Sequence, residues 1–276
     1  MQGEQSSSNP QGNDQNTQAA SDATAKPGFW KKLARIIVTV SLPLIAMGQW
    51  VDTRDLIIDS YQGFVTHFTD QVELNMLAEV RVGGNLDYLE EVFGVAKLIK
   101  SSATQDNLQY RYYHHPKFIL TLAVSQNQVV GYTLTTLKAD FAPPITFSDL
   151  TLGEQQFAEM QNFGEVFTAD AANIHYYMEQ KQLAREGLFY NRYLTHVEYG
   201  AETIDEESAV EPVAQQLNRI ADAYALNDTD RLRSELTALR QQQKPNTYTL
   251  GQLTLEQAAE TVLTRYEFKA YFGQGS

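Results

Sequence analysis

The clearest pattern in the sequence is an uncharged apolar stretch near its start. Residues 36–51 read IIVTVSLPLIAMGQWV and contain no charged side chain. A bilayer core requires about 20 apolar residues, so this stretch and the residues just before it give a marginal span, in which Arg35 extends to the headgroups. Trp30 and Trp50 lie at the two ends, where tryptophans anchor membrane helices. The pattern predicts a transmembrane helix over residues 28–51.

Charges on the two flanks predict the orientation of this helix. The basic residues Lys31, Lys32 and Arg35 lie at its start, whereas residues 52–59 carry three aspartates and one arginine. Basic flanks remain on the cytoplasmic side, so we expect a cytoplasmic N-terminus and a periplasmic C-terminal domain at a cell inner membrane. Three alternatives stay open for the apolar stretch: a cleaved signal peptide, an amphipathic helix on the membrane surface and a buried core helix.

Two segments with other patterns border the apolar stretch. Residues 1–27 are rich in Ser, Gln, Asn, Gly and Ala, and we expect a disordered tail because they cannot form a core. Residues 52–82 place apolar side chains at steps of three and four, which predicts a helix that is either a stalk or the first helix of the domain. Its wide apolar stripe must pack against something, so a homo-oligomer formed through residues 52–82 is one candidate assembly.

Residues 83–200 contain two segments with the same order of patterns. Each has a short amphipathic stretch that ends at a glycine, Gly94 or Gly164, and then a loop and an aromatic strand. In the first segment the polar residues 125–128 separate two apolar runs, which predicts a hairpin. We therefore expect an α+β domain in which a helix-strand-strand unit is used twice and the sheet is mainly antiparallel.

Three short motifs of the first unit carry a resemblance to known proteins. They are LEEVFG at residues 89–94, YRYY at residues 110–113 and VVGY at residues 129–132. Together they resemble the small α+β modules of the SmpA/OmlA type in bacterial envelope proteins, although Ala96 stands where those modules usually have proline. The whole chain also resembles an uncharacterised family of bacterial membrane-anchored proteins with this arrangement. The resemblance implies protein-protein contact and no catalysis.

The pattern becomes helical in residues 201–276. Pro212 can begin one helix, and Asp228 or Thr229 can cap a second. Thr254 and Gln257 have the spacing of a capping box for a third helix. We therefore expect a C-terminal α-helical subdomain.

Composition and charge narrow the range of partners. The formal net charge is -13, which argues against a nucleic-acid partner because phosphate binding requires a basic face. The same charge argues against a domain that lies flat on an anionic leaflet. Cysteine is absent, so disulfides and thiolate chemistry are excluded.

The sequence carries no specific catalytic or metal-binding motif. None of the five histidines belongs to an HExxH motif, and neither a GxSxG nor a phosphate-binding loop is present. If a site exists, His175 with Glu179, or His196 with Glu198, is the place to look, since either pair could share a strand face. We expect no cofactor, no metal site and no enzymatic activity.

Tyrosines of the aromatic runs are the candidate binding residues. Tyrosine is enriched at contact surfaces because it combines a large apolar area with a polar tip. One interpretation is an aromatic sheet face or edge that receives a peptide or glycan, and the other is that alternate rings fill the core. The residues are Tyr110, Tyr112, Tyr113, Tyr176, Tyr177 and Tyr193.

These patterns favour a non-catalytic single-pass membrane protein. Its outer α+β domain would mediate protein-protein interaction or sensing, with the lipid bilayer and another envelope protein as partners. The alternative is a membrane-anchored hydrolase that acts on envelope polymers, which would require a pocket with two carboxylates or a histidine with carboxylates. A third arrangement has inverted topology, with the domain in the cytosol.

Overall fold

The computed structural model describes residues 70–161, 163–201 and 212–273. The chain divides into two compact units, Met1–Val65 and Thr66–Ser276, and every described element belongs to the second. The predicted tail, the predicted transmembrane helix and most of the predicted helix over residues 52–82 lie outside the described residues. In the part that is described, no helix has both the length and the apolar character needed to cross a bilayer.

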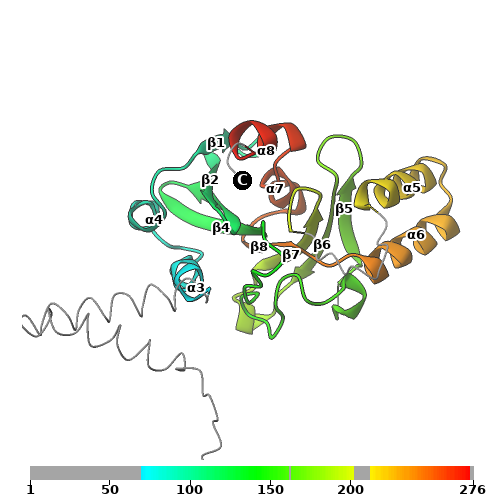
Figure 1. Cartoon of the computed structure of the whole chain (residues 1–276), viewed down its shortest axis with the longest axis horizontal. Coiled ribbons are helices and arrows are strands. Elements are labelled where there is room, and N and C mark those ends of the chain that lie inside the picture. Colours follow the sequence, from blue (N-terminus) through cyan, green and yellow to red (C-terminus); the bar gives the residue numbers. More distant parts are fainter. Residues whose placement is uncertain (1–69, 162, 202–211, 274–276) are drawn as a thin grey trace, which may run out of the picture. The chain divides into compact units, whose positions relative to one another are not determined.

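The fold is built on an 8-stranded sheet with the order β1-β2-β3-β4-β8-β7-β6-β5, in which all neighbours are antiparallel (Figure 1). This confirms the predicted α+β class and antiparallel sheet. One half consists of β1 (Leu98–Ser101), β2 (Leu108–His115), β3 (Phe118–Ser125) and β4 (Gln128–Thr136). The other half consists of β5 (Val166–Asp170), β6 (Tyr176–Gln182), β7 (Asn191–Val197) and β8 (Thr247–Gly251).

The two halves of the sheet mirror each other in strand order. Each runs from an edge to the centre, and their last strands, β4 and β8, pair with each other. Both central strands contain Tyr-Thr-Leu, at residues 132–134 and 248–250. Thr133 pairs with Thr249, while Tyr132 pairs with Leu250 and Leu134 with Tyr248. The register therefore relates the halves by an approximate two-fold axis at the Thr133–Thr249 pair.

Helices cover both faces of the sheet. Side chains of α3 (Gln71–Ala78), α4 (Leu86–Phe93), α5 (Val213–Ala225) and α6 (Thr229–Gln242) join one core cluster with Leu120, Leu134 and Leu194 of the sheet. Side chains of α7 (Leu255–Glu260) and α8 (Arg265–Tyr271) join a second cluster with Tyr110, Ile119 and Tyr193. In Figure 1, α5 and α6 lie beside β5 and β6, and α7 and α8 lie near β1 and β2. Both sheet faces are therefore closed by helices.

Local sequence accounts for several of these boundaries. Asn85 caps α4 by accepting a hydrogen bond from the Asp87 amide, and Gly94 ends it with a positive φ. Gln126 and Asn127 form the β3–β4 turn with φ of 51° and 66°, values that a two-residue hairpin turn requires. Thr254 and Gln257 form the predicted capping box of α7.

The structure corrects three predicted elements. The helix expected before Gly164 is a single 3-10 turn, Phe157–Glu159. Within the described part of residues 52–82, α3 ends at Ala78 and turns follow it. Residues 201–276 do not form an all-helical subdomain, because Thr247–Gly251 is strand β8 at the centre of the sheet. Its five residues gave no helical period, and their strand partners are far away in sequence.

Candidate functional site

The six candidate tyrosines lie in the interior and form no exposed binding face. Each is at most 5% exposed. Because helices cover both sheet faces, alternate rings pack into opposite cores: Tyr113 and Tyr177 into one, and the other four into the second. The prediction of an aromatic face for a peptide or glycan is therefore corrected, and the alternative that the rings fill the core describes their location.

The hydroxyl groups of these tyrosines have structural partners. The Tyr110 hydroxyl donates to Glu260 Oε2 at 2.7 Å, and the Tyr193 hydroxyl donates to the Leu253 carbonyl at 2.5 Å. Glu260 also accepts from the Ser102 hydroxyl at 2.5 Å and the Ala103 amide at 3.1 Å, so it ties α7 to the loop after β1. These contacts join the last helices to the sheet and leave the hydroxyls engaged.

The histidines pair differently from the expected arrangement. His175 Nδ1 lies 2.7 Å from Glu198 Oε2, because residues 175 and 198 extend the Tyr176–Val197 pair of β6 and β7 by one position. His196 Nδ1 lies 2.8 Å from the Lys244 carbonyl oxygen. Neither His175 with Glu179 nor His196 with Glu198 is brought together as a site. Among the described residues, no group of three or more His, Cys, Asp or Glu side chains could hold a metal ion.

Among the residues that the structure describes, Glu179 is the most deeply buried carboxylate. It is 0% exposed, and its Oε1 accepts from Arg240 Nε at 2.7 Å and from the Tyr177 hydroxyl at 2.7 Å. Burial raises the pKa of Glu179 despite these two partners. Arg240 also donates to the Phe157 carbonyl at 2.9 Å, so the group connects β6, α6 and the 3-10 turn. This network explains how α6 is fixed to the sheet.

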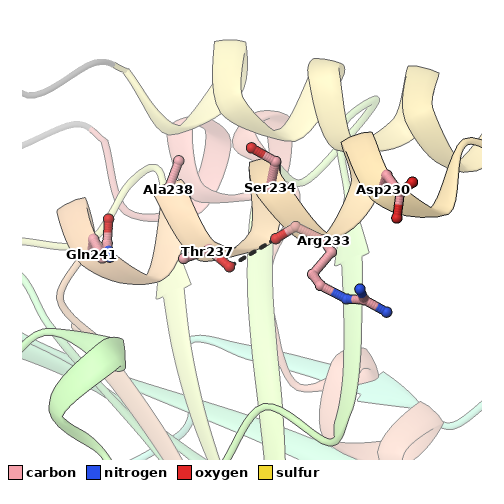
Figure 2. A pocket seen from close by; sticks show the side chains of 6 residues that line it. All are labelled: Asp230, Arg233, Ser234, Thr237, Ala238 and Gln241. Carbon is pink, nitrogen blue, oxygen red and sulfur yellow. Dashed lines mark hydrogen bonds between the residues drawn. The ribbon is translucent and has the colours of Figure 1, made fainter.

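A hollow on α6 offers no converging chemical groups. Figure 2 shows that its lining residues all come from this one helix, and Thr237 Oγ1 donates within the helix to the Arg233 carbonyl at 2.8 Å. A ligand there would meet one side of a helix and no opposing wall, so the hollow is an open helix surface. The lining residues are Asp230, Arg233, Ser234, Thr237, Ala238 and Gln241.

Within the described part of the chain, the loop between β6 and β7 combines high exposure with an uncommon backbone conformation. β6 ends at Gln182 and β7 begins at Asn191, so eight residues, 183–190, lie between them; we call this loop the β6–β7 knuckle. Leu188 and Phe189 are 58% and 65% exposed. Both adopt the left-handed conformation, with φ of 56° and 58°, which is uncommon for residues other than glycine. The knuckle therefore presents two large apolar side chains on a strained backbone.

Hydrogen bonds within the knuckle hold its backbone in place. The Leu183 amide donates to the Tyr190 carbonyl at 2.9 Å, which closes the base of the loop. The amides of Leu188 and Phe189 donate to the carbonyls of Arg185 and Ala184 at 3.0 and 3.2 Å. Leu183, the first residue of the knuckle, is buried, and a Cβ added at Gly187 would lie 2.5 Å from the Leu183 Cβ. The exposed pair thus stands on a fixed support.

The other half of the sheet shows that the fold does not require the knuckle. The equivalent connection there is the turn between β2 and β3, which consists of Pro116 and Lys117 alone, since β2 ends at His115 and β3 begins at Phe118. Sequence analysis missed Leu188, and it included Phe189 only as the start of the aromatic run that continues to Tyr193. The available signal was that two apolar residues, Leu188 and Phe189, directly follow Gly187 between two predicted strands. The aromatic residues that follow made the pair look like part of a strand.

Comparison with known proteins assigns no family. No protein-family model and no curated protein matches the chain. Among solved structures, the chain is similar to a cysteine-rich secretory protein from Staphylococcus aureus, with 13% identity and a TM-score of 0.31. The match covers 67% of this chain and 48% of that structure, less than two thirds of its length. A TM-score of this size does not establish a shared fold.

Proposed function

We propose that this chain is a non-catalytic, membrane-tethered protein whose outer α+β domain binds another protein of the bacterial envelope through the β6–β7 knuckle. The single observation that carries the binding role is the exposure of Leu188 and Phe189 on a left-handed, hydrogen-bonded backbone. The tether is the apolar stretch over residues 28–51, with the N-terminus in the cytoplasm.

The β6–β7 knuckle does not stabilise the domain in the absence of a partner. A left-handed conformation costs about 1–2 kcal/mol at each residue other than glycine, and the exposed side chains leave apolar area in water. The two-residue turn in the other half connects equivalent strands without either cost. Backbone strain concentrates at binding sites, where contact with a partner offsets it. A partner that covers Leu188 and Phe189 supplies such a compensation.

The charge of the chain favours a protein over other partners. With a net charge of -13, neither a nucleic acid nor an anionic membrane surface offers an electrostatic attraction. Large apolar side chains at the centre of a contact are the usual anchors of protein interfaces. We therefore expect an apolar recess on the partner that receives the knuckle.

Photo-crosslinking tests the binding role. A photoreactive phenylalanine is placed at Phe189 of the full chain in the host cell, and the control carries it at Tyr266 of α8, which is 73% exposed. We expect a discrete adduct with one envelope protein from position 189, its loss when Leu188→Ser is added, and none of it from position 266. An absence of adducts at position 189, or the same adducts from both positions, contradicts the proposal.

Reporter fusions test the tether and its orientation. Alkaline phosphatase and a green fluorescent protein are fused separately after Ser276, and the products are fractionated. Phosphatase activity in the membrane fraction is the expected result, since the enzyme is active only outside the cytoplasm. Fluorescence in the membrane fraction would overturn the orientation. A shortened, soluble periplasmic product would show that the apolar stretch is a signal peptide.

A further inference from the structure

Arg192, the second residue of β7, is a buried cation that has no carboxylate partner among the described residues. It is 3% exposed, and its Nη2 donates to the carbonyl oxygen of Thr146 at 2.5 Å and to that of Phe147. Its Nε is buried and forms no hydrogen bond. Burial lowers the pKa of Arg192, as expected where a charge is removed from water. Its charge is thus directed at two successive peptide groups of one loop.

The internal symmetry of the sheet shows that an apolar residue suits this position. Arg192 pairs with Leu250 of β8, and in the other half Leu120 pairs with Leu134 of β4. Leu134 and Leu250 are the equivalent leucines of the two Tyr-Thr-Leu motifs, so Leu120 is the counterpart of Arg192. Leu120 is 0% exposed and belongs to the core on the same face. The sheet itself therefore does not require a charge here.

The two carbonyl groups belong to the tip of the loop between β4 and β5. Phe147 is 48% exposed and has a φ of 59°, so it repeats the exposed and left-handed character of Leu188 and Phe189. The Thr146 hydroxyl lies 2.8 Å from the Tyr132 hydroxyl and 3.4 Å from that of Tyr248. The base of the tip is closed by the Ile145 amide, which donates to the Leu150 carbonyl at 2.9 Å. We call residues 141–152 the Phe147 loop.

Arg192 joins the Phe147 loop to the knuckle. It lies three residues after Phe189 in the chain, and its guanidinium reaches the backbone of Phe147. The neighbouring Tyr190 packs against the same core cluster that contains Ile145 and Leu152 of the Phe147 loop. Two strained and exposed apolar tips are thus connected through one buried side chain.

We infer that Arg192 is a positioning residue that holds the Phe147 loop beside the knuckle, so that Phe147, Leu188 and Phe189 form one contact surface for a protein partner. The inference rests on the proposed function and extends its surface to a second loop. Asp149, two residues after Phe147, is exposed, and the chain as a whole is acidic. Charge complementarity therefore favours a partner with an apolar recess bordered by basic side chains.

Hydrogen exchange on the full chain tests the positioning role without a partner. In Arg192→Leu, which copies the counterpart residue, we expect the melting temperature to stay equal or to rise, because a buried charge is removed. Amides of the Phe147 loop, such as those of Ile145 and Leu152, should exchange on the order of tenfold faster. Arg192→Lys should restore part of the protection, since lysine supplies the charge without the planar fork of donors. Unchanged exchange in the loop, or unfolding of the whole domain, would overturn the inference.

Crosslinking separates this inference from the proposed function. We expect photoreactive phenylalanine at Phe147 and at Phe189 to label the same protein, and Arg192→Leu to remove the adduct at position 147 only. An adduct at 189 alone in the unmodified chain would retain the knuckle and refute the two-loop surface. If neither position labels a protein while Arg192→Leu loosens the loop, the proposed function fails and the positioning role of Arg192 stands. Binding of phosphatidylglycerol vesicles through either tip, or labelling of a second copy of this chain, would overturn the choice of partner.

Discussion

Buried polar side chains in this domain differ in how their hydrogen-bonding groups are satisfied. Glu179 is paired with Arg240, whereas Arg192 meets carbonyl oxygens. His196 is 4% exposed and bonds through Nδ1 alone, and its Nε2 is buried without a hydrogen-bond partner. Since the Lys244 carbonyl can only accept, Nδ1 carries the proton and Nε2 holds a free lone pair. A second proton on this ring would be a buried charge with no partner at Nε2.

Protonation of His196 should make the domain less stable in mild acid. Burial lowers the pKa of His196, and the bond to the Lys244 carbonyl offsets this only in part. Because the pKa of His196 is lower in the folded state, the unfolded chain takes up this proton at a higher pH than the folded domain does. The contribution of neutral His196 to the free energy of unfolding is therefore complete above the unfolded pKa of about 6.5 and is lost as the pH falls below it. The loss is at most about 1.4 kcal/mol per pH unit. Urea denaturation between about pH 5 and 7.5 measures this slope.

The matched variant for this measurement is His196→Asn. The asparagine amide can still donate to the Lys244 carbonyl, but it does not titrate in this range. We expect the variant to lose the part of the slope that belongs to His196. Burial also lowers the pKa of His114 and of His115, and both remain in the variant, so their contribution is common to the two proteins. Identical pH profiles would show that His196 does not titrate on unfolding in this window.

At the scale of single elements, the knuckle combines strain with exposure. Asparagine tolerates the left-handed conformation better than leucine, so Leu188→Asn should raise the free energy of unfolding by about 0.5–1 kcal/mol. The control is Leu226→Asn at the end of α5, where leucine is 72% exposed but has a φ of -84°. Urea denaturation should show a gain for the first variant alone. If Leu188→Asn raises the free energy of unfolding and also removes the crosslink from position 189, the strain at Leu188 is retained because this residue binds the partner. If the variant lowers the free energy of unfolding, Leu188 stabilises the fold instead.

The start of α6 distinguishes two neighbouring cap candidates. The Asp228 side chain accepts from the Arg231 amide at 3.0 Å, and Thr229 is the first residue of the helix. Removal of a capping side chain costs about 1 kcal/mol, so Asp228→Ala should destabilise the domain by that amount. Thr229→Ala should change the free energy of unfolding by less than about 0.5 kcal/mol. Equal losses for the two variants would place the cap at both residues.

Local rules predicted the elements whose signals lie within a few residues. The capping box of α7 and the β3–β4 turn depend on neighbouring side chains and backbone angles, and both were predicted. Strand β8 was not predicted, because Thr247–Gly251 has partners in β4 and β7 that lie far away in sequence. The tyrosines were assigned correctly to strands, but their burial depends on helices that cover both faces. The exposure and positive φ of Leu188 and Phe189, and the burial of Arg192, are known only from the structure, although the apolar pair after Gly187 is visible in the sequence.

At the scale of the whole domain, the centre of the sheet is assembled from distant parts of the chain. Thr133 and Thr249 meet through their hydroxyls at 2.7 Å, and Thr133 also donates to Thr261 after α7 at 2.8 Å. Tyr132 and Tyr248 meet on the other face, with ring centroids 5.9 Å apart. A Cβ at Gly251 would lie 2.3 Å from the Gly131 Cα, so the two central strands approach closely at this pair. Residues 247–261 therefore complete the sheet and the core that β4 and the preceding strands begin.

Removal of the C-terminal region should abolish folding of the whole domain. A chain that ends after Gly200 lacks β8, which leaves β4 and β7 without their common neighbour and exposes both cores. We expect residues 66–276 to unfold in one cooperative transition and residues 66–200 to show none, as measured by circular dichroism against urea. A chain that ends after Leu263 keeps β8 and α7, so it should fold with reduced stability. A cooperative transition in residues 66–200 would show instead that the strands before β8 form an independent domain, as the sequence pattern alone predicted.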